Sequence, residues 1–316
     1  MAFQAMDAAI EGFRIAREKP KAMLIWAAAS LVISLVSSIG MVALFGGTLN
    51  EFMAMSRAPS DDPAEVMAML GQVGLLYAFL LPLALLVFAI FTAAVYRSVL
   101  RPADSAFGYL RLGMTELRLA VVMLVLFLLG IAASIVVTLV LGLVGAIVGV
   151  GMNAGGAGGI GAGIAVAVLI ILIYIGMIFA TLVFWTKFSF AGPMTFNDGR
   201  IRIFESWSAT KGHFWSLLGC YVVAGILGIV VGLLGGVIAM AVMLGFGGGE
   251  GGSFLAILES MEADYTSVAT FLSPAMIANL VINALISALT YAIFLAPPAV
   301  AYRDIVVRRS GADISA

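Results

Sequence analysis

Few side chains in this chain of 316 residues could perform chemistry. It contains a single histidine, His213, and a single cysteine, Cys220. A hydrolase site of the Ser-His-Asp type would have to use His213, and no carboxylate lies within the apolar runs to complete it. One cysteine forms neither an intrachain disulfide nor a cysteine-based metal site. The sequence therefore predicts a non-enzymatic protein without a metal ion or other cofactor.

The acidic residues Asp61, Asp62 and Glu65 are close enough in sequence to bind a cation. The order Asp-Asp-Pro is also typical of a solvated helix start with proline in the first turn. We therefore expect a short helix from there to about Gly71. Ser253–Ser260 could form a second one. Both would lie outside the apolar runs, as lids or interfacial caps.

The chain is 63% apolar and only 10% charged, whereas a soluble domain carries about a quarter of charged residues. Six uncharged stretches are each long enough to span a bilayer, because about 20 apolar residues suffice for a membrane helix. They are 22–45, 75–96, 119–150, 160–186, 214–246 and 275–300. The pattern predicts an all-α integral membrane protein with six transmembrane helices, forming a single membrane domain over 1–316.

Positive charge is distributed unevenly between the loops. Of the 16 Lys and Arg residues, all but Arg57 lie on one side of the six runs. Cytoplasmic loops carry the excess of Lys and Arg. We therefore expect a multi-pass protein of the cytoplasmic (inner) membrane, with both termini in the cytoplasm.

The same charge pattern divides the chain into three tandem units, about 1–101, 102–196 and 197–309. Each unit would consist of a cytoplasmic amphipathic helix followed by a transmembrane hairpin. The expected apolar faces, spaced by three and four residues, are Phe3, Met6, Ile10 and Phe13; Phe107, Leu110, Met114 and Leu117; and Ile201, Phe204 and Trp207. Two units also end alike, with Tyr96-Arg97 and Tyr302-Arg303.

The first membrane helix of each unit carries small residues at every fourth position. Small residues let helix backbones approach closely in lipid, where burial of apolar surface does not drive association. These stripes predict that the first, third and fifth membrane helices pack together. The stripe residues are Ser30, Ser34 and Ser38; Gly130, Ser134 and Gly142; and Gly228, Gly232 and Gly236.

The most polar membrane surface lies on the sixth run, where Asn279, Asn283, Ser287 and Tyr291 share one helix face. Buried amides need hydrogen-bond partners in apolar surroundings. This face could hold helices together, or it could form the wall of a polar pathway or a headgroup site.

The basic cytoplasmic side chains have two interpretations. They could serve only to fix the topology and snorkel to lipid phosphates, or they could form a contact surface for anionic lipids or a membrane-protein partner, including a second copy of the chain. The candidates are Arg14, Arg17, Arg97, Arg111, Lys211 and Arg303. No dense basic stripe with interleaved aromatic residues occurs, so no nucleic-acid partner is expected.

Residues 188–219 resemble a known group of proteins. The resemblance rests on Phe188-Ser189-Phe190, Pro193, Glu205-Ser206-Trp207 and Lys211-Gly212-His213-Phe214-Trp215. This segment is similar to the membrane domain found ahead of some bacterial glycerophosphodiester phosphodiesterases, and to related uncharacterised six-helix bacterial membrane proteins. The catalytic domain of the fused enzymes has no counterpart in these residues, so the resemblance implies a membrane module and carries over no catalytic residue.

These observations favour a scaffold or accessory protein that contacts protein or lipid partners through its cytoplasmic helices. The alternative is a transporter or lipid-handling protein with a polar cavity between the units, because internal repeats are frequent in transporters. A polar cavity that reaches the membrane midplane would favour the alternative, and a filled core would favour the scaffold.

Overall fold

The computed structural model describes residues 4–57, 62–154, 160–246 and 272–308, which are 89% helical and include no strand. The long helices are α3 (Pro20–Arg57), α4 (Pro63–Leu100), α5 (Met114–Ala154), α6 (Ile160–Phe188), α9 (Phe214–Phe246) and α12 (Pro274–Tyr302). The short elements are α1 (Ala5–Ala9), α2 (Glu11–Glu18), the 3₁₀ turn η1 (Ala106–Tyr109), α7 (Ala191–Asp198), α8 (Glu205–Ala209) and the π-helical turn η2 (Arg303–Val307).

The six long helices are each long and apolar enough to cross a membrane. This confirms the prediction of a multi-pass helical membrane protein. The 41 residues of α5 extend over about 60 Å at 1.5 Å per residue, roughly twice the thickness of the hydrocarbon core. Helices α3, α4 and α5 continue well beyond their apolar runs, whereas α9 coincides with its run.

Local signals set two of the helix starts. The side chain of Asp62 accepts a hydrogen bond from the Ala64 amide at 2.8 Å, and Pro63 occupies the first turn of α4. The expected start is thus confirmed, but no separate short helix ends near Gly71, because α4 continues to Leu100. The other expected short helix, over 253–260, lies outside the described residues. Ser273 caps α12 in the same way as Asp62 caps α4.

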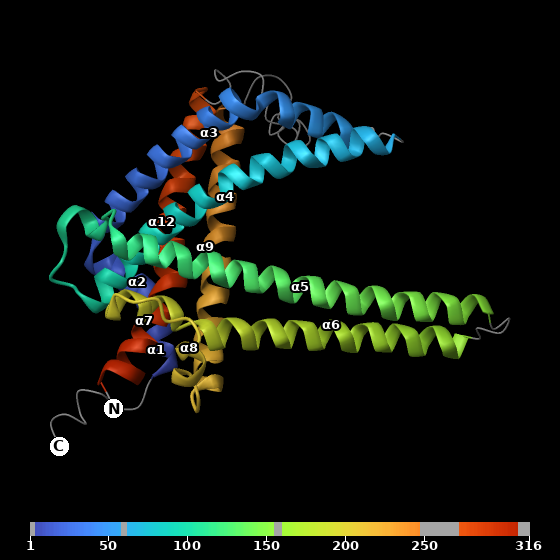
Figure 1. Ribbon diagram of the computed structural model, residues 1–316. Helices are drawn as coiled ribbons and strands as arrows, with labels where there is room; N and C mark the ends of the chain where they lie inside the picture. The colour runs from blue at the N-terminus through green and yellow to red at the C-terminus, as the bar shows by residue number, and fades with distance from the viewer. Residues whose placement is uncertain (1–3, 58–61, 155–159, 247–271, 309–316) are drawn as a thin grey trace.

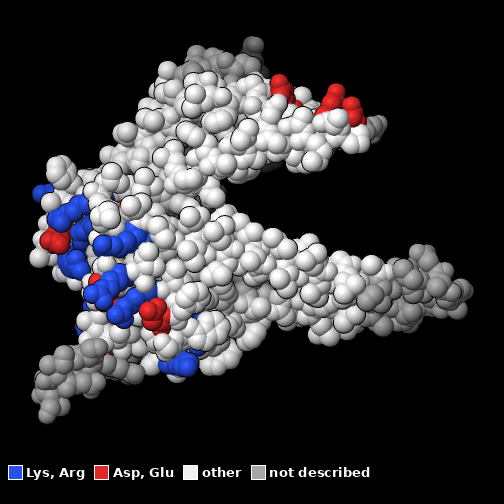
Figure 2. Space-filling view, viewed as in Figure 1, with Lys and Arg blue, Asp and Glu red and all other residues white. Residues whose placement is uncertain are grey.

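Two helical hairpins diverge from one end of the molecule as two arms, α3–α4 and α5–α6 (Figure 1). The short elements gather at the end where the arms meet. The space-filling view shows Lys and Arg side chains clustered over this end, and acidic side chains near the far tip of the α3–α4 arm (Figure 2). We call the end that carries the short elements the basic end.

The centre of the bundle is α12, which packs against α9, α3, α2 and α4. Its buried face repeats alanine at Ala284, Ala288, Ala292 and Ala296, each at most 4% exposed. The expected close packing of the odd-numbered membrane helices was wrong, because α3, α5 and α9 all pack mainly on other partners. Small residues do bring the helices together, but the stripe that does so lies on the sixth membrane helix.

The stripes expected on the odd-numbered helices are only partly buried. Ser30 is buried on α3, and Gly228 is buried on α9, where a β-carbon would lie 2.3 Å from the Phe294 ring of α12. The other stripe residues do not pack closely in this way: a β-carbon would meet nothing within 4 Å at Gly130, Gly142, Gly232 and Gly236, Ser134 is exposed, and Ser34 and Ser38 are half-buried.

The short elements differ from three amphipathic helices packed by their large apolar residues. In α1 and α2 the buried residues include Ala8, Ala9, Gly12 and Ile15, whereas the expected face, Met6, Ile10 and Phe13, is exposed. Gly12 explains the reversal, because a β-carbon there would lie 2.5 Å from the Ile293 Cα of α12. The helix expected over 107–117 is replaced by η1, a loop and the start of α5.

Candidate functional site: the basic end of the bundle

A buried ion pair joins the ends of two membrane helices at the basic end. Arg97, in the last turn of α4, donates to the Glu116 carboxylate in the first turn of α5. The side chains are 6% and 2% exposed, respectively. The guanidinium also donates to the Tyr109 carbonyl and lies 5.6 Å from the centre of the Phe196 ring. Arg97 therefore joins α4, α5, η1 and α7.

The connection between these helices contains three successive residues with positive φ, namely Phe107 (51°), Gly108 (62°) and Tyr109 (69°). Left-handed backbone costs about 1–2 kcal/mol for a residue with a β-carbon, so the turn must be held in place. The buried indole of Trp26 on α3 donates to the Gly108 carbonyl at 2.6 Å, and Arg97 holds the next carbonyl. The result is a fixed loop whose Phe107 side chain is 84% exposed.

A cavity of about 540 Å³ lies between this loop and the start of α3. It is lined by Glu18, Lys19, Lys21 and Ser105, by the η1 residues, and by the apolar side chain of Ile25. Lys19 is fixed by donation to the Ser98 carbonyl at 2.6 Å and by the Tyr109 ring, 4.9 Å from its ammonium group. The cavity thus combines two basic side chains, one acidic side chain, a hydroxyl and an apolar wall.

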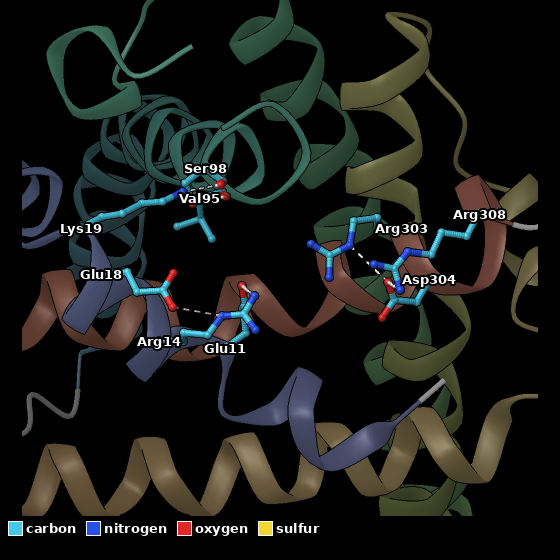
Figure 3. A network of polar contacts seen from close by, with 9 residues as sticks. All are labelled: Glu11, Arg14, Glu18, Lys19, Val95, Ser98, Arg303, Asp304 and Arg308. Carbon is cyan, nitrogen blue, oxygen red and sulfur yellow. Dashed lines mark hydrogen bonds and ion pairs between the residues drawn. The ribbon is translucent and has the colours of Figure 1, made fainter. Parts of the chain in front are cut away.

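A second group of charges surrounds the junction of α2 with the end of α12 (Figure 3). Glu11 is 6% exposed and accepts a hydrogen bond from Arg14 at 2.9 Å. Burial raises the pKa of Glu11 above its ordinary value, while the charges of Arg14 and Arg303 oppose that rise. Arg303 itself pairs with Asp304 at 3.1 Å, and Arg308 pairs with the same carboxylate at 3.2 Å.

The segment that carries the family resemblance forms the corner between α6 and α9. The hydroxyl of Ser206 donates to the Lys187 carbonyl at 2.7 Å and accepts from the Phe190 amide at 3.1 Å. The Lys187 ammonium lies 5.7 Å from the Trp207 ring and 5.8 Å from the Phe214 ring. These contacts lie within the corner, and Phe190 also packs against Tyr302 at the end of α12.

The two Tyr-Arg ends flank α7. The Tyr96 ring meets Phe196 edge-on and the Tyr302 ring meets Phe190 edge-on, with ring centres 6.0 Å apart in both pairs. Asn197 also donates to the Tyr302 hydroxyl at 3.3 Å. The similarity of the two sequence ends therefore corresponds to a similar environment in the fold.

The expected cytoplasmic contact residues fall into two groups. Arg14, Arg17, Arg111 and Lys211 are exposed and Arg303 is half-buried, so their side chains are accessible. The expectation for Arg97 was wrong, because its ion pair with Glu116 buries the side chain and removes it from the contact surface. Little in the sequence indicated this pair, because Arg97 directly follows an apolar run but Glu116 lies three residues before the next one, with Arg118 between them.

Two residues of the expected polar face of α12 bond to each other within their own helix. The Asn283 amide is exposed and donates to both oxygens of Asn279 in its own helix, at 2.7 and 2.9 Å. The Tyr291 ring stacks on Phe91 of α4 with centres 4.6 Å apart. Ser287 is half-buried. Only Tyr291 therefore shows the bridging role that the sequence predicts for this face.

Comparisons of the chain with protein-family models, with curated proteins and with solved structures find no match.

Proposed function

We propose that this chain is a non-enzymatic accessory or scaffold protein of a bacterial inner membrane, and that its basic end binds anionic lipid of the cytoplasmic leaflet. The observation that carries the proposal is the presence of exposed cations and exposed large apolar side chains on the same end of the bundle. Exposed basic residues there include Arg14, Arg17, Arg111 and Lys211.

The exposed apolar side chains at this end suit a membrane interface. Phe107 is 84% exposed, Leu112 74%, Trp215 72% and Phe204 68%. Aromatic side chains favour the level of the lipid headgroups, and Lys and Arg favour the phosphates. A soluble partner would have to cover both kinds of group, whereas a bilayer surface supplies apolar and anionic groups together. The excess of Lys and Arg at this end supports a cytoplasmic location for it and for both termini.

Contacts between successive units support three tandem units that close a ring. Glu116, early in the second unit, pairs with Arg97 at the end of the first. Ser206, early in the third unit, bonds to Lys187 at the end of the second membrane hairpin. Glu11 of the first unit lies in the field of Arg303 at the end of the third. The start of each unit would thus contact the end of the unit before it.

The test is the composition of lipid that stays bound to the protein. The full chain would be placed in nanodiscs of phosphatidylcholine and phosphatidylglycerol, and bound lipids would be counted by native mass spectrometry. Each exposed cation near an anionic surface contributes about 1 kcal/mol, or about fivefold in preference. The variant R17A/R111A/K211A should lose most of the enrichment in phosphatidylglycerol.

The matched control is Arg57→Ala, which removes a cation from the opposite end of the molecule. It should retain the wild-type enrichment. Equal enrichment in the triple variant and in the control would refute lipid binding at the basic end.

A further inference from the structure

The cavity between the η1 loop and the start of α3 lies where the basic end meets the membrane-spanning part of that helix. Its lysines, Lys19 and Lys21, come directly before the apolar run that begins at residue 22, whereas Ile25 in its wall belongs to that run. Basic side chains at the end of a membrane helix lie at the level of the lipid phosphates. With the basic end in the cytoplasm, as proposed, the cavity is level with the headgroups of the cytoplasmic leaflet.

Both lysines can donate to an anion in the cavity. Lys19 uses one donor for the Ser98 carbonyl, at 2.6 Å, and an ammonium group has three. Lys21 is exposed, and among the described residues it has no carboxylate partner. Glu18 also lines the cavity, but its carboxylate is directed at Arg14, 3.8 Å away (Figure 3). Because Arg14 balances the charge of Glu18, the lysines leave the cavity with an excess of positive charge.

Exposed apolar surface continues from the cavity along α3. Ile25 in the cavity wall is 38% exposed, and Val32 and Val36 are 60% and 65% exposed. These two valines follow Ile25 by about two and three turns, so all three side chains lie on one face of the helix. A soluble anion would use the lysines alone. A lipid also matches the apolar face, because its acyl chain leaves the headgroup in that direction.

We propose that the cavity is a discrete site for one anionic phospholipid, whose phosphate group is bound by Lys19, Lys21 and the Ser105 hydroxyl and whose acyl chain follows the exposed face of α3. This inference rests on the proposed function and adds a defined position and stoichiometry to it. The exposed cations Arg17, Arg111 and Lys211 do not line the cavity, so the site is separate from the wider contact surface.

The dimensions and rigidity of the cavity suit such a site. Its volume of about 540 Å³ falls within the roughly 300–1,000 Å³ of sites for small ligands. One wall is the η1 loop, which the Trp26 indole and the Arg97 guanidinium hold through backbone carbonyls. Binding therefore does not have to order this wall, and the entropic cost of forming the site is small.

The first test removes one charge from the site. The full chain, purified in nonionic detergent, would be titrated with phosphatidylglycerol or phosphatidylcholine, and the lipids bound to it would be counted by native mass spectrometry. The first phosphatidylglycerol should bind about five- to 25-fold more tightly than the first phosphatidylcholine, because each lysine contributes about fivefold. Lys21→Gln should reduce this preference by about fivefold. Lys21 is chosen because Lys19 also holds the Ser98 carbonyl.

The matched control for the charge is Arg200→Gln. Arg200 is an exposed cation directly after α7 at the same end of the molecule, but it does not line the cavity. Its replacement should leave the preference of the first bound lipid unchanged. Equal losses in Lys21→Gln and Arg200→Gln would overturn the discrete site, since they would indicate an attraction spread over the whole basic end.

The second test blocks the cavity without changing its charge. Ser105→Trp places a large side chain in the cavity from an exposed position and should abolish the preference. Leu112→Trp adds the same side chain at another exposed position of the basic end that does not line the cavity, and it should have no effect. A preference that survives in Ser105→Trp would overturn the site.

A third measurement distinguishes a lipid from a soluble phosphate. Inorganic phosphate or glycerol 3-phosphate, added in an amount equimolar to phosphatidylglycerol, should not displace the first bound lipid, because neither has an acyl chain for the face of α3. Displacement under these conditions would assign the cavity to a soluble phosphate and overturn the lipid.

The failure of this site can be distinguished from the failure of the proposed function. The variant R17A/R111A/K211A leaves the cavity intact, so it should keep the preference of the first bound lipid while it loses the enrichment in nanodiscs. An unselective first lipid in the wild type, together with that loss of enrichment, would overturn the cavity alone. A selective first lipid with unchanged enrichment in the triple variant would instead overturn the wider contact surface.

Discussion

Replacement of Glu116 by Gln should strongly destabilise the bundle. The change keeps the size of the side chain and removes its charge, so Arg97 keeps its place but loses its counter-ion. The Arg97 side chain is only 6% exposed, and solvent cannot take over the role of the carboxylate. Breaking a buried ion pair in this way costs about 3–5 kcal/mol.

The double variant Arg97→Met/Glu116→Leu removes both charges. It should cost less stability than the sum of the two single variants Arg97→Met and Glu116→Leu. It still loses the donation from Arg97 to the Tyr109 carbonyl and the contact with the Phe196 ring. Those losses amount to about 2–4 kcal/mol together. The two single changes should sum to about 6–10 kcal/mol, so we expect a coupling energy of several kcal/mol.

The free energies would be measured by unfolding in mixed micelles of nonionic detergent and sodium dodecyl sulfate, followed by far-UV circular dichroism. Asp104→Asn is the matched control, because its pair with Arg111 spans 3.9 Å with both side chains 46% exposed. That change should cost less than about 0.5 kcal/mol. A cost below 1 kcal/mol for Glu116→Gln, or strict additivity in the double variant, would refute the role we assign to the buried pair.

Three further changes can be followed by the same unfolding measurement. Gly12→Ala should cost about 1–3 kcal/mol because its β-carbon would collide with the Ile293 backbone, whereas Gly232→Ala should cost nothing, since that position is open. Glu11→Gln should stabilise the protein at neutral pH. Because the pKa of Glu11 is raised in the folded protein, its ionisation opposes folding, and the stability of the wild type falls as pH rises. The advantage of the variant should therefore vanish in acid. Phe107→Gly should change stability by less than about 1 kcal/mol, because the relief of the positive φ is offset by the loss of a ring that we place at the membrane interface.

The six membrane helices were predictable because the bilayer imposes a length and a composition on any segment that crosses it. The ends of these helices were less predictable. Once outside the hydrocarbon a helix can continue at little cost, and α3 therefore reaches Arg57 although its apolar run ends near residue 45. The start of α4 was visible in the sequence because Asp62 and Pro63 act within one turn and need no tertiary partner.

The choice of central helix was wrong for a reason that lies in the bilayer itself. The membrane helices are apolar over most of their surface, and the polar face of α12 does not mark its buried side, so hydrophobic periodicity does not reveal which face is buried. Small residues are then the remaining signal, and they occur on several helices. The alanines of α12, from Ala284 to Ala296, have the same four-residue spacing as the glycines of α9. Alanine is a common helix residue, and its repeat on α12 attracts less notice than a repeat of glycine.

The loop over 107–113 was predicted as a helix because Phe107, Leu110, Met114 and Leu117 have helical spacing. Two long-range contacts determine its actual conformation, one from the Trp26 indole and one from the Arg97 guanidinium. Neither partner is adjacent in sequence, and each stabilises a backbone that Phe107 would avoid in isolation. A local pattern cannot reveal a conformation that depends on partners brought in by the fold.

The residues of the segment 188–219 are held by contacts with one another. Ser206, Phe190 and Lys187 hold the corner between α6 and α9 through bonds to one another and through stacking of Lys187 on aromatic rings. The resemblance in this segment therefore concerns one corner of the bundle, and it predicts neither the packing of the other helices nor a ligand.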